Sequence, residues 1–287
     1  MNTRAKMTLS IRDHDRNAAH MTYIYPVVSR RAGGVSVGVN LNPNNACNWR
    51  CIYCQVPNLK RGAAPEINLN LLEAELTALL SDILHGDFMQ TRVPENARRL
   101  NDIAISGNGE PTSAKAFPEV IQLIGRVMKR FDLVNKIKLI LITNGSLLAR
   151  PPVQLGLKRM AKLQGEVWYK LDAATRDGMA RINNTHQSLK KTAAHLSLAA
   201  SLCPTYVQTC VFAQNGVAPN ELEQQTYLDF LASLITQGIK LRGVLLYGIA
   251  RPSQQPEAPQ LSPLPPMWME EFARKIAQTG LSVRITP

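Results

Sequence analysis

The feature that most constrains the fold of this chain is a regular alternation of apolar, β-rich runs with segments of helical periodicity. The runs that read as strands lie at 34–42, 102–107, 136–144, 166–173, 205–213 and 240–250. Segments with apolar residues at helical spacing lie between them, near 69–84, 115–131, 152–163, 176–201 and 220–237. Strands that alternate with helices predict βα units and a parallel sheet. We therefore expect an α/β fold that contains most, but not all, of an eight-fold barrel.

The chain beyond the sixth strand reads differently. The proline-rich stretch "RPSQQPEAPQLSPLPP" (251–266) predicts an extended connector, because proline cannot continue a helix or a central strand. The following "MWMEEFARKIAQTG" predicts a last helix. We expect three regions: an N-terminal extension (1–32), a barrel core (33–250), and a connector with a C-terminal helix (251–287).

The strand 166–173 has two unlike faces. Alternation places Lys170 and Asp172 on one side, opposite the apolar Tyr169 and Leu171. A packed barrel interior disfavours buried charges unless they are paired or bound to something. The polar side therefore lines an interior cavity with a ligand, or Lys170 and Asp172 form an internal ion pair that supports the barrel mouth.

The most specific motif is "NPNNACNWRCIYCQVPN", which holds Cys47, Cys51 and Cys54 on a turn-rich segment just after the first strand. This is the carboxyl end of the sheet, where α/β barrels bind ligands. Three thiolates can hold three irons of a cubane cluster and leave the fourth iron open. A reactive metal site keeps such an open position, so the spacing predicts a cluster that binds a substrate.

Two alternatives compete with a cluster. A structural zinc site needs a fourth ligand, and His20 and His85 lack zinc-finger spacing. Cys203 and Cys210 lie beside or within a later strand and read as core residues. Chance clustering of buried cysteines is the other alternative, but the loop between them is too polar for it. The three clustered thiols in a chain of this size also favour a reducing, cytoplasmic compartment over a disulfide framework.

The composition adds a hint about partners. The chain has 33 Lys and Arg against 21 Asp and Glu, a formal net charge of +12. A basic protein attracts polyanions, so RNA or another polyanionic substrate becomes a candidate partner. The basic residues stand in scattered pairs such as "MKRFD" and "SLKK", so a solvated surface without a cognate polyanion is the alternative. No apolar run reaches the roughly 18–20 residues of a membrane span, and we expect no membrane partner.

With these motifs in place, the sequence resembles the radical S-adenosylmethionine (radical SAM) superfamily, whose cluster loop reads C-x3-C-x-aromatic-C. Tyr53 occupies the aromatic position. "SGNGEPT" after the second strand resembles the superfamily's Gly-Gly-Glu motif, with Asn108 in place of one glycine. "ITNGSLL" and "VWYKLDAATRDGMARIN" resemble small radical SAM proteins related to wyosine-type tRNA synthases. The wyosine synthases carry further cysteines before the main motif, and residues 1–46 have none, which disfavours that particular reaction.

The resemblance implies a partial (β/α)6 TIM-like barrel with a C-terminal helical extension. It also implies a [4Fe-4S] cluster on the three cysteines, S-adenosylmethionine as the second cofactor, and a reductant such as flavodoxin or ferredoxin. The implied metal ligands are Cys47, Cys51 and Cys54, and the implied contacts of S-adenosylmethionine are Tyr53, Gly107, Asn108, Gly109, Glu110, Asn144, Lys170 and Asp172.

Each implied contact has a role and a plainer alternative. The glycines let the backbone approach the methionyl amine, and Lys170 neutralises its carboxylate while Asp172 accepts from the ribose. Glu110 fixes its loop or accepts from the ammonium, or it is a surface turn acid. Asn144 contacts the ribose or only forms a turn, and Tyr53 packs near the adenine or wedges the loop.

Two further residues are weaker candidates. Gln208 lies on the polar side of the fifth predicted strand, and His186 follows "RINN" in a helical stretch. A lone histidine in such a stretch is more often a surface or packing residue.

Three functions follow for comparison. The first is a radical SAM enzyme of unassigned substrate, with RNA favoured by the charge. The second is an activase that abstracts hydrogen from the backbone of a glycyl-radical enzyme. The third is a non-catalytic module that binds zinc or RNA, with zinc at the three cysteines.

Overall fold

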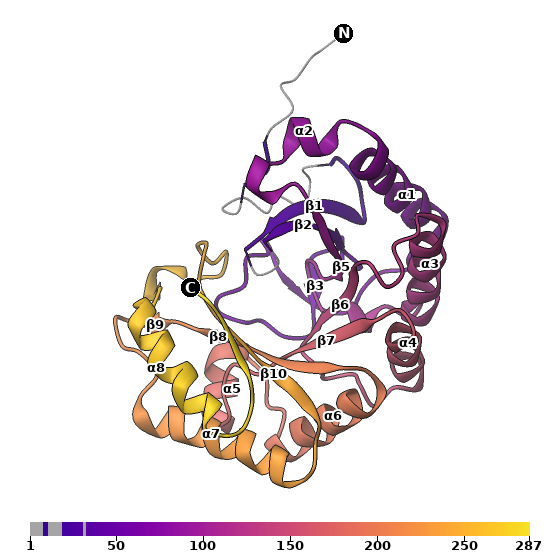
Figure 1. The fold of residues 1–287 in the computed structure, drawn as a ribbon. Helices are drawn as coiled ribbons and strands as arrows, with labels where there is room; N and C mark the ends of the chain where they lie inside the picture. Colours follow the sequence, from indigo (N-terminus) through magenta and orange to yellow (C-terminus); the bar gives the residue numbers. More distant parts are fainter. Residues whose placement is uncertain (1–7, 11–18, 31–32) are drawn as a thin grey trace.

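The computed structural model describes residues 8–10, 19–30 and 33–287 of the chain. Strands from these residues form one curled, open sheet of eight, in the order β1-β2-β5-β6-β7-β8-β10-β12 (Figure 1). The first strand pairs antiparallel with the second, and all other neighbours are parallel. Helices cover the outer face of the sheet. The expected α/β class and curled half barrel are confirmed.

Six strands of the sheet correspond to the six predicted runs, and one more is added at each edge. The strands are β1 (Ile24–Ser29), β2 (Gly34–Val39), β5 (Leu100–Ile105), β6 (Lys138–Thr143), β7 (Gly165–Lys170), β8 (Thr205–Val211), β10 (Leu241–Gly248) and β12 (Val283–Thr286). Two short pairs lie outside the sheet: β3 (Ala46–Cys47) with β4 (Lys60–Arg61), and β9 (Ala213–Gln214) with β11 (Leu261–Ser262).

The added edge strands fall in the regions that we expected to flank the barrel. β1 lies within 1–32 and β12 within 251–287, and Arg30 after β1 donates a hydrogen bond to the carbonyl of Pro287 after β12. The two edges of the open sheet therefore meet at that point. Of the predicted extension, residues 1–7, 11–18 and 31–32 lie outside the described part, and the domain boundaries themselves stay a prediction.

The helices match the predicted segments with one exception. They are α1 (Leu69–His85), α2 (Phe88–Arg92), α3 (Phe117–Arg130), α4 (Pro151–Ala161), α5 (Arg176–Asn183), α6 (Leu189–Leu202), α7 (Glu221–Thr236) and α8 (Pro266–Ala277), with short 3-10 turns η1 (Glu95–Ala97), η2 (Pro111–Ser113) and η3 (Ala258–Gln260). The single helix expected over 176–201 is wrong. Asn184 adopts a left-handed backbone with φ of 52° and ends α5, and Ser188 begins α6 by accepting from the amide of Lys191.

Helix starts follow local chemistry where the sequence supplies it. The Asn68 side chain caps α1 by accepting from the amide of Leu71. Asn220 was expected to cap α7 and does so in a full capping box, in which Glu223 returns a bond to the Asn220 amide. In the described part of the chain, no helix combines the length and apolarity that crossing a bilayer requires.

The main core lies between the outer face of the sheet and the helices. In β7, Val167 and Tyr169 are fully buried there, whereas Trp168 and Lys170 are only partly buried on the other side. The alternation predicted for this strand is thus present. Polar side chains of the inner face are left to line the interior near the carboxyl ends of the strands.

Candidate functional site

The three clustered cysteines line one pocket of about 260 Å³ at the carboxyl ends of the strands. All three are free thiols and are partly buried. The predicted cofactor contacts that line the same pocket are Tyr53, Gly107, Asn108, Gly109, Glu110, Asn144 and Lys170. Asp172 is the exception, because it lines a neighbouring cavity. Segments that are far apart in the sequence therefore converge where the ligand was expected.

Burial keeps the thiols protonated when no metal is bound. It raises the pKa of Cys47 to about 11 and that of Cys51 to about 12. Two donors oppose this effect: the amide of Trp49 lies 3.5 Å from the Cys47 sulfur, and Nδ2 of Asn183 lies 3.3 Å from the Cys51 sulfur. A coordinating metal deprotonates a thiol outright, and these donors then stabilise the thiolate.

The donor set suits a cluster better than a single ion. In the described part of the chain, no three side chains of His, Cys, Asp or Glu gather closely enough to hold one metal ion. An iron–sulfur cubane requires only one thiolate for each ligated iron. Three soft sulfur ligands spread around one pocket fit that requirement, and they fit tetrahedral zinc poorly.

Two asparagines that sequence reasoning left without a role join the cysteine loop to the "GNGE" loop. Asn40 and Asn42 follow β2 and are buried. Oδ1 of Asn40 accepts from the amide of Asn108 at 3.0 Å, and Nδ2 of Asn42 donates to the carbonyl of Ala46 at 2.9 Å. Both residues lie on the polar face of their strand, which was the only signal available in the sequence.

Glycine at 109 lets these loops touch. A Cβ atom there would lie 2.0 Å from the carbonyl oxygen of Ala46, a distance that no real Cβ contact allows. At Gly107 a Cβ would lie 2.3 Å from Oδ1 of Asn40. The glycines therefore serve the packing of two loops, besides leaving backbone open to a ligand.

Glu110 is buried and is not a surface turn acid. Its carboxylate accepts from the hydroxyls of Thr112 at 2.5 Å and Thr143 at 2.6 Å, and from the amides of Thr112 at 3.1 Å and Asn144 at 2.7 Å. Burial raises the pKa of Glu110 above its usual value, although these donors oppose the shift. Glu110 thus ties the loop after β5 to the end of β6, the loop-fixing role among those considered.

Asn144 connects the end of β6 to the cysteine loop. Its Nδ2 donates to Oδ1 of Asn48 at 2.8 Å, and Nδ2 of Asn48 donates to the hydroxyl of Ser146 at 2.7 Å. Because Asn48 follows Cys47 directly, this network positions the first cysteine. The side chain of Asn144 is more than a turn former.

Lys170 places a cation in the pocket. Its Nζ donates to the Tyr247 hydroxyl at 3.0 Å and lies 4.9 Å from the centre of the Tyr53 ring. Burial opposes its charge, but Tyr247 and Asp172 outweigh burial and hold the Lys170 pKa well above its usual value. A lysine that is charged in an enclosed pocket is suited to bind a carboxylate.

Asp172 does not pair directly with Lys170. It accepts instead from Nδ2 of Asn183 at 2.6 Å, from the amide of Cys210 at 2.9 Å and from the Tyr53 hydroxyl. The carboxylate therefore holds Tyr53, and with it the cysteine loop, against β7 and β8. The direct ion pair considered from the sequence is absent between these two described residues.

Gln208 on β8 has an unused donor in the pocket. The residue is 1% exposed, it lines the cysteine pocket, and its Nε2 has no hydrogen-bond partner among the described residues. A buried amide without a partner is costly, so a site that is filled by a polar ligand explains it best. His186 is exposed and lines neither cavity.

The remaining cysteines differ from each other. Cys203 is buried in the main core, and its thiol donates to the carbonyl of Gly165 at 3.2 Å, away from the pocket. Cys210 is also buried but lines the cysteine pocket and its neighbour. The core interpretation describes Cys203, and Cys210 belongs to the wall between the two cavities.

The proline-rich connector wraps the cysteine loop, a contact that the sequence did not reveal. The Ser253 hydroxyl donates to the carbonyls of Ile52 at 2.7 Å and Cys54 at 3.1 Å. Further along, Nη1 and Nη2 of Arg50 donate to the two carboxylate oxygens of Glu257 at 2.9 and 2.7 Å. We call residues 251–257 the strap, because they hold the loop that carries Cys51 and Cys54.

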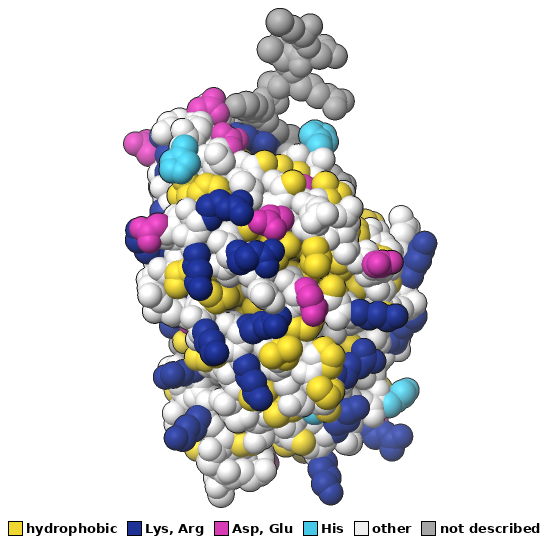
Figure 2. Space-filling view, turned by 90° about the vertical axis from the view of Figure 1, so that its right-hand side faces the viewer, with side chains coloured by type: hydrophobic (Ala, Val, Ile, Leu, Met, Phe, Trp, Pro, Cys, Tyr) yellow, Lys and Arg dark blue, Asp and Glu magenta, His cyan; other side chains and the backbone are white. Residues whose placement is uncertain are grey.

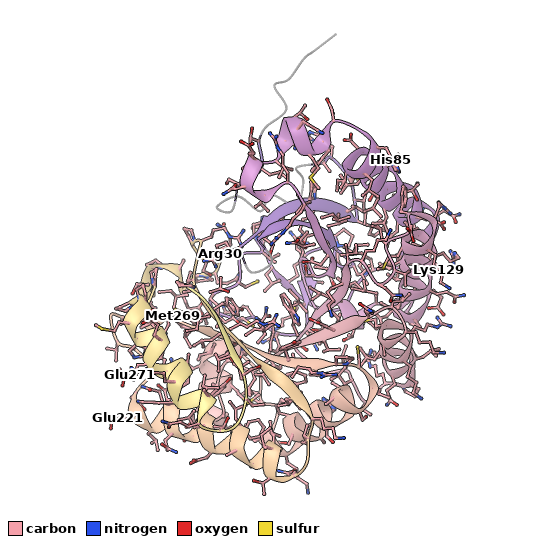
Figure 3. The ribbon with its side chains drawn as sticks, viewed as in Figure 1. Arg30, His85, Lys129, Glu221, Met269 and Glu271 are labelled. Atoms are coloured by element: carbon pink, nitrogen blue, oxygen red, sulfur yellow. The ribbon has the colours of Figure 1, made fainter. Side chains whose placement is uncertain are left out.

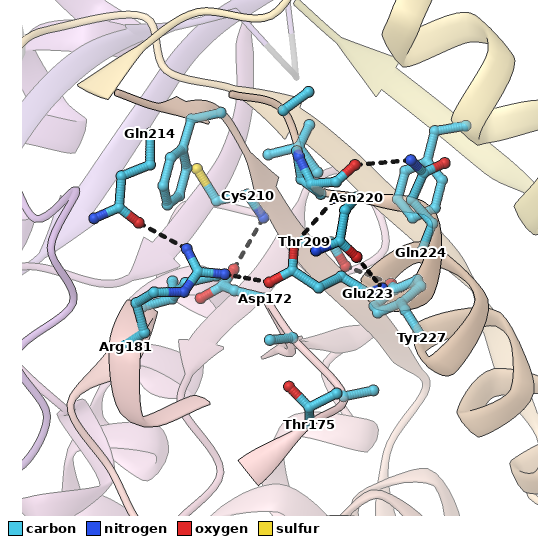
Figure 4. Close-up of a pocket in the computed structure, with 18 of the residues that line it drawn as sticks. Asp172, Thr175, Arg181, Thr209, Cys210, Gln214, Asn220, Glu223, Gln224 and Tyr227 are labelled. Atoms are coloured by element: carbon cyan, nitrogen blue, oxygen red, sulfur yellow. Dashed lines mark hydrogen bonds and ion pairs between the residues drawn. The ribbon is translucent and has the colours of Figure 1, made fainter. Parts of the chain in front are cut away.

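A second cavity of about 440 Å³ adjoins the first (Figure 4). Arg181 on α5 donates to Oε1 of Gln214 at 2.7 Å and pairs with Glu223 on α7, so these side chains link the walls of the cavity. The hydroxyls of Thr209 and Tyr227 lie 2.6 Å apart in its wall. Together the two cavities offer more room than the cysteine pocket alone.

Comparison with solved structures places the fold in a class. The chain superimposes on a radical SAM methyltransferase from Sphaerobacter thermophilus with a TM-score of 0.58 and 15% identity, over 88% of this chain and 66% of that one. A spore photoproduct lyase mutant gives a TM-score of 0.51 and 12% identity, over 84% of this chain and 74% of that one. The chain thus has the fold seen in radical SAM enzymes, and it spans about two thirds of the length of the methyltransferase.

Sequence comparison gives a nearer relative without a described function. A UPF0026 protein of Helicobacter pylori strain J99 is 28% identical over 239 residues, which cover 83% of this chain and 68% of the relative. No protein-family model matches the chain. The resemblance to the wyosine-type group stays a prediction.

Proposed function

We propose that this protein is a radical SAM enzyme. Cys47, Cys51 and Cys54 would hold a [4Fe-4S] cluster whose fourth iron is open to S-adenosylmethionine. The observation that carries the proposal is convergence: three thiols, a glycine-rich loop, a buried lysine and an unpartnered buried amide line one pocket in a fold shared with radical SAM enzymes.

The reduced cluster, when bound, supplies one electron that cleaves S-adenosylmethionine to methionine and a 5′-deoxyadenosyl radical, which abstracts hydrogen from the substrate. The protein's own residues bind and orient. Lys170 would pair with the methionyl carboxylate, and the backbone at Gly107–Gly109 would face the methionyl amine. Gln208 would donate its free N–H to an acceptor of the cofactor.

Residues that contact each other rather than a ligand have a positioning role in this proposal. Asp172 holds Tyr53, Asn144 holds Asn48, and Glu110 joins two loops. The expected contact of Asp172 with ribose would require one of its oxygens to accept an additional bond. The larger cavity would receive the part of the cofactor or substrate that the cysteine pocket cannot enclose.

The proposed substrate is an RNA, because a net charge of +12 favours a polyanion. A reductant such as flavodoxin or ferredoxin would supply the electron. We expect the protein to act in the cytoplasm, where thiols stay reduced.

The test is the formation of 5′-deoxyadenosine. The protein is purified without oxygen, reconstituted with iron and sulfide, and given dithionite and S-adenosylmethionine, with the product measured by mass spectrometry. Wild type is expected to form it, and the triple variant Cys47→Ala/Cys51→Ala/Cys54→Ala is expected to form none. Cys203→Ala is the matched control and should remain active, because its thiol lies in the core. A wild-type protein that holds four irons yet forms no deoxyadenosine would contradict the proposal, and a colourless zinc protein would favour the non-catalytic module.

A further inference from the structure

One outer face of the half barrel carries most of the positive charge of the chain. Residues 126–162, which include the end of α3 and all of α4, contain nine Lys and Arg and one Asp, a net charge of +8 against +12 for the whole chain. Pairs that look scattered in the sequence are therefore gathered in space. We call this surface the basic face, and its basic residues are Arg126, Lys129, Arg130, Lys136, Lys138, Arg150, Lys158, Arg159 and Lys162.

Ion pairs neutralise only part of the basic face. Arg126 and Arg130 share Glu73 at 3.2 and 3.0 Å, Lys138 pairs with Glu166 at 2.9 Å, and Lys136 pairs with Asp132. Counting those three carboxylates still leaves a net charge of +6. The exposed cations without a carboxylate partner among the described residues include Lys129, Arg150, Lys158 and Lys162.

The charge is polarised across the molecule. Figure 2 looks onto the side of α1, α3 and α4, where dark blue Lys and Arg side chains are spread widely and Asp and Glu are few. The segment 220–237, which includes α7, has three acidic residues and no Lys or Arg. Figure 3 shows Lys129 on one side of the molecule and Glu221 and Glu271 on the other. Like charges repel, so a face this uneven indicates a polyanionic partner rather than solvation alone.

The position of the basic face argues against the electron donor as that partner. A donor protein must approach the cysteine pocket, which lies on the inner side at the carboxyl ends of the strands. α3 and α4 cover the outer face, so a helix layer and the sheet separate the basic face from the pocket. A helix alone is about 10 Å across, and a donor docked here would be far from the cluster.

The chemistry of the basic face favours a duplex over a single strand. Proteins that bind single-stranded nucleic acid offer exposed aromatic rings on which bases stack. The large exposed hydrophobic residues in the described part of the chain are all aliphatic, and the one on this face is Leu155. A surface of Lys and Arg without aromatic rings instead suits phosphates along a backbone. The 14 residues of α3 extend about 21 Å, enough to follow several phosphates.

We propose that the basic face docks the base-paired stem of a structured RNA through its phosphates. This inference rests on the proposed function, in that it takes the substrate to be an RNA. The stem would be held on the outside of the barrel while another part of the same RNA reaches the pocket. The contacts read the phosphate backbone and carry no base sequence.

The test is binding of a fluorescent 20-base-pair RNA stem to the full chain, measured by anisotropy at 50 and 200 mM salt. The variant Lys129→Gln/Lys158→Gln/Lys162→Gln removes three unpaired cations from the basic face. The matched control Lys240→Gln/Arg242→Gln/Arg274→Gln removes three exposed cations elsewhere. We expect the first variant to weaken binding about tenfold or more and to lower the salt slope by about 2. The control should change binding less than about twofold.

Several results would overturn the proposal. Equal weakening in the two variants would mean general basicity, and a tighter complex with duplex DNA or polyglutamate than with the RNA stem would mean another partner. Basal deoxyadenosine formation without RNA is measured in parallel and should be the same in the face variant as in wild type. RNA binding without deoxyadenosine would leave the docking surface and remove the proposed function, and the reverse result would do the opposite.

Discussion

The parallel sheet and the cysteine loop are stabilised in opposite ways. The sheet is held by backbone ladders and by fully buried apolar residues such as Val39, Leu141 and Tyr169. The cysteine loop has only the two-residue pairing of β3 with β4 as regular structure. Its backbone is fixed instead by polar side chains that arrive from distant segments, among them Asn42 and Ser253.

The difference separates two kinds of mutational effect. Burial of apolar surface sets the stability of the whole domain. Hydrogen bonds at a loop contribute about 1 kcal/mol each, yet they decide where three sulfurs lie. Changes in the sheet should therefore alter global stability, and changes around the loop should alter metal retention with a smaller effect on stability.

The largest loss of stability is expected from the sheet. Leu141→Ala leaves a cavity in a fully buried position of β6 and should lower the free energy of unfolding by about 3 kcal/mol. Urea denaturation measures the loss. Leu155→Ala, at an exposed position of α4, is the matched control and should change it by less than about 0.5 kcal/mol. A comparable loss in both variants would contradict the account of the core.

Gly109→Ala should affect the cysteine loop more than the sheet. The added Cβ would meet the carbonyl of Ala46, and overpacking of this kind costs about 1–3 kcal/mol. Because the loop must shift to relieve it, iron bound after reconstitution should fall well below the wild-type content. Gly62→Ala is the control, since its Cβ would lie 3.4 Å from the Cβ of Ala46. Full iron content in Gly109→Ala would show that the close approach does not matter.

Glu110 gives the site a pH dependence with a definite sign. Burial raises its folded-state pKa, so its contribution to stability is fully present below the unfolded pKa and is lost as pH rises through the folded value. Wild type should therefore lose stability relative to Glu110→Gln as pH rises from about 4, by about 1.4 kcal/mol for each unit that separates the two pKa values. Urea midpoints over a pH series measure this difference. The opposite slope would mean that the donors from Thr112, Thr143 and Asn144 outweigh burial.

The smallest change in stability is expected from the strap. The Arg50–Glu257 pair is partly exposed, so Glu257→Gln should cost less than about 1 kcal/mol. Hydrogen exchange should nevertheless quicken around Cys54, because the strap is no longer held beside Arg50. Glu271→Gln breaks an exposed pair on α8 and should leave exchange at Cys54 unchanged. Equal exchange in wild type and Glu257→Gln would remove the strap from the account.

Local patterns in the sequence predicted most of the fold. The six apolar runs correspond to six strands because each is a short β-rich segment bounded by turns. β1 and β12 were missed, since each gains its meaning only by pairing with a strand elsewhere in the chain. The break between α5 and α6 was also missed, because helical periodicity continues across it while Asn184 turns the backbone left-handed.

The site was predictable where a motif carries it and hidden where contacts are long-range. The cysteine spacing and "GNGE" pointed to loops that do meet in one pocket. Asn183, which donates to both Cys51 and Asp172, and Glu257, which pairs with a residue 207 positions away, leave no local pattern. Such partners become visible only once the chain is folded.

The most direct test of the central claim asks whether S-adenosylmethionine binds the open iron of a cluster held by three cysteines. The reduced, reconstituted protein is given S-adenosylmethionine labelled with nitrogen-15 at its amino group, and electron–nuclear double resonance is recorded. We predict a nitrogen-15 coupling to the cluster in wild type, and a weaker one in Lys170→Met, which lacks the cation for the carboxylate. A four-iron protein whose spectrum does not change with the cofactor would contradict the account.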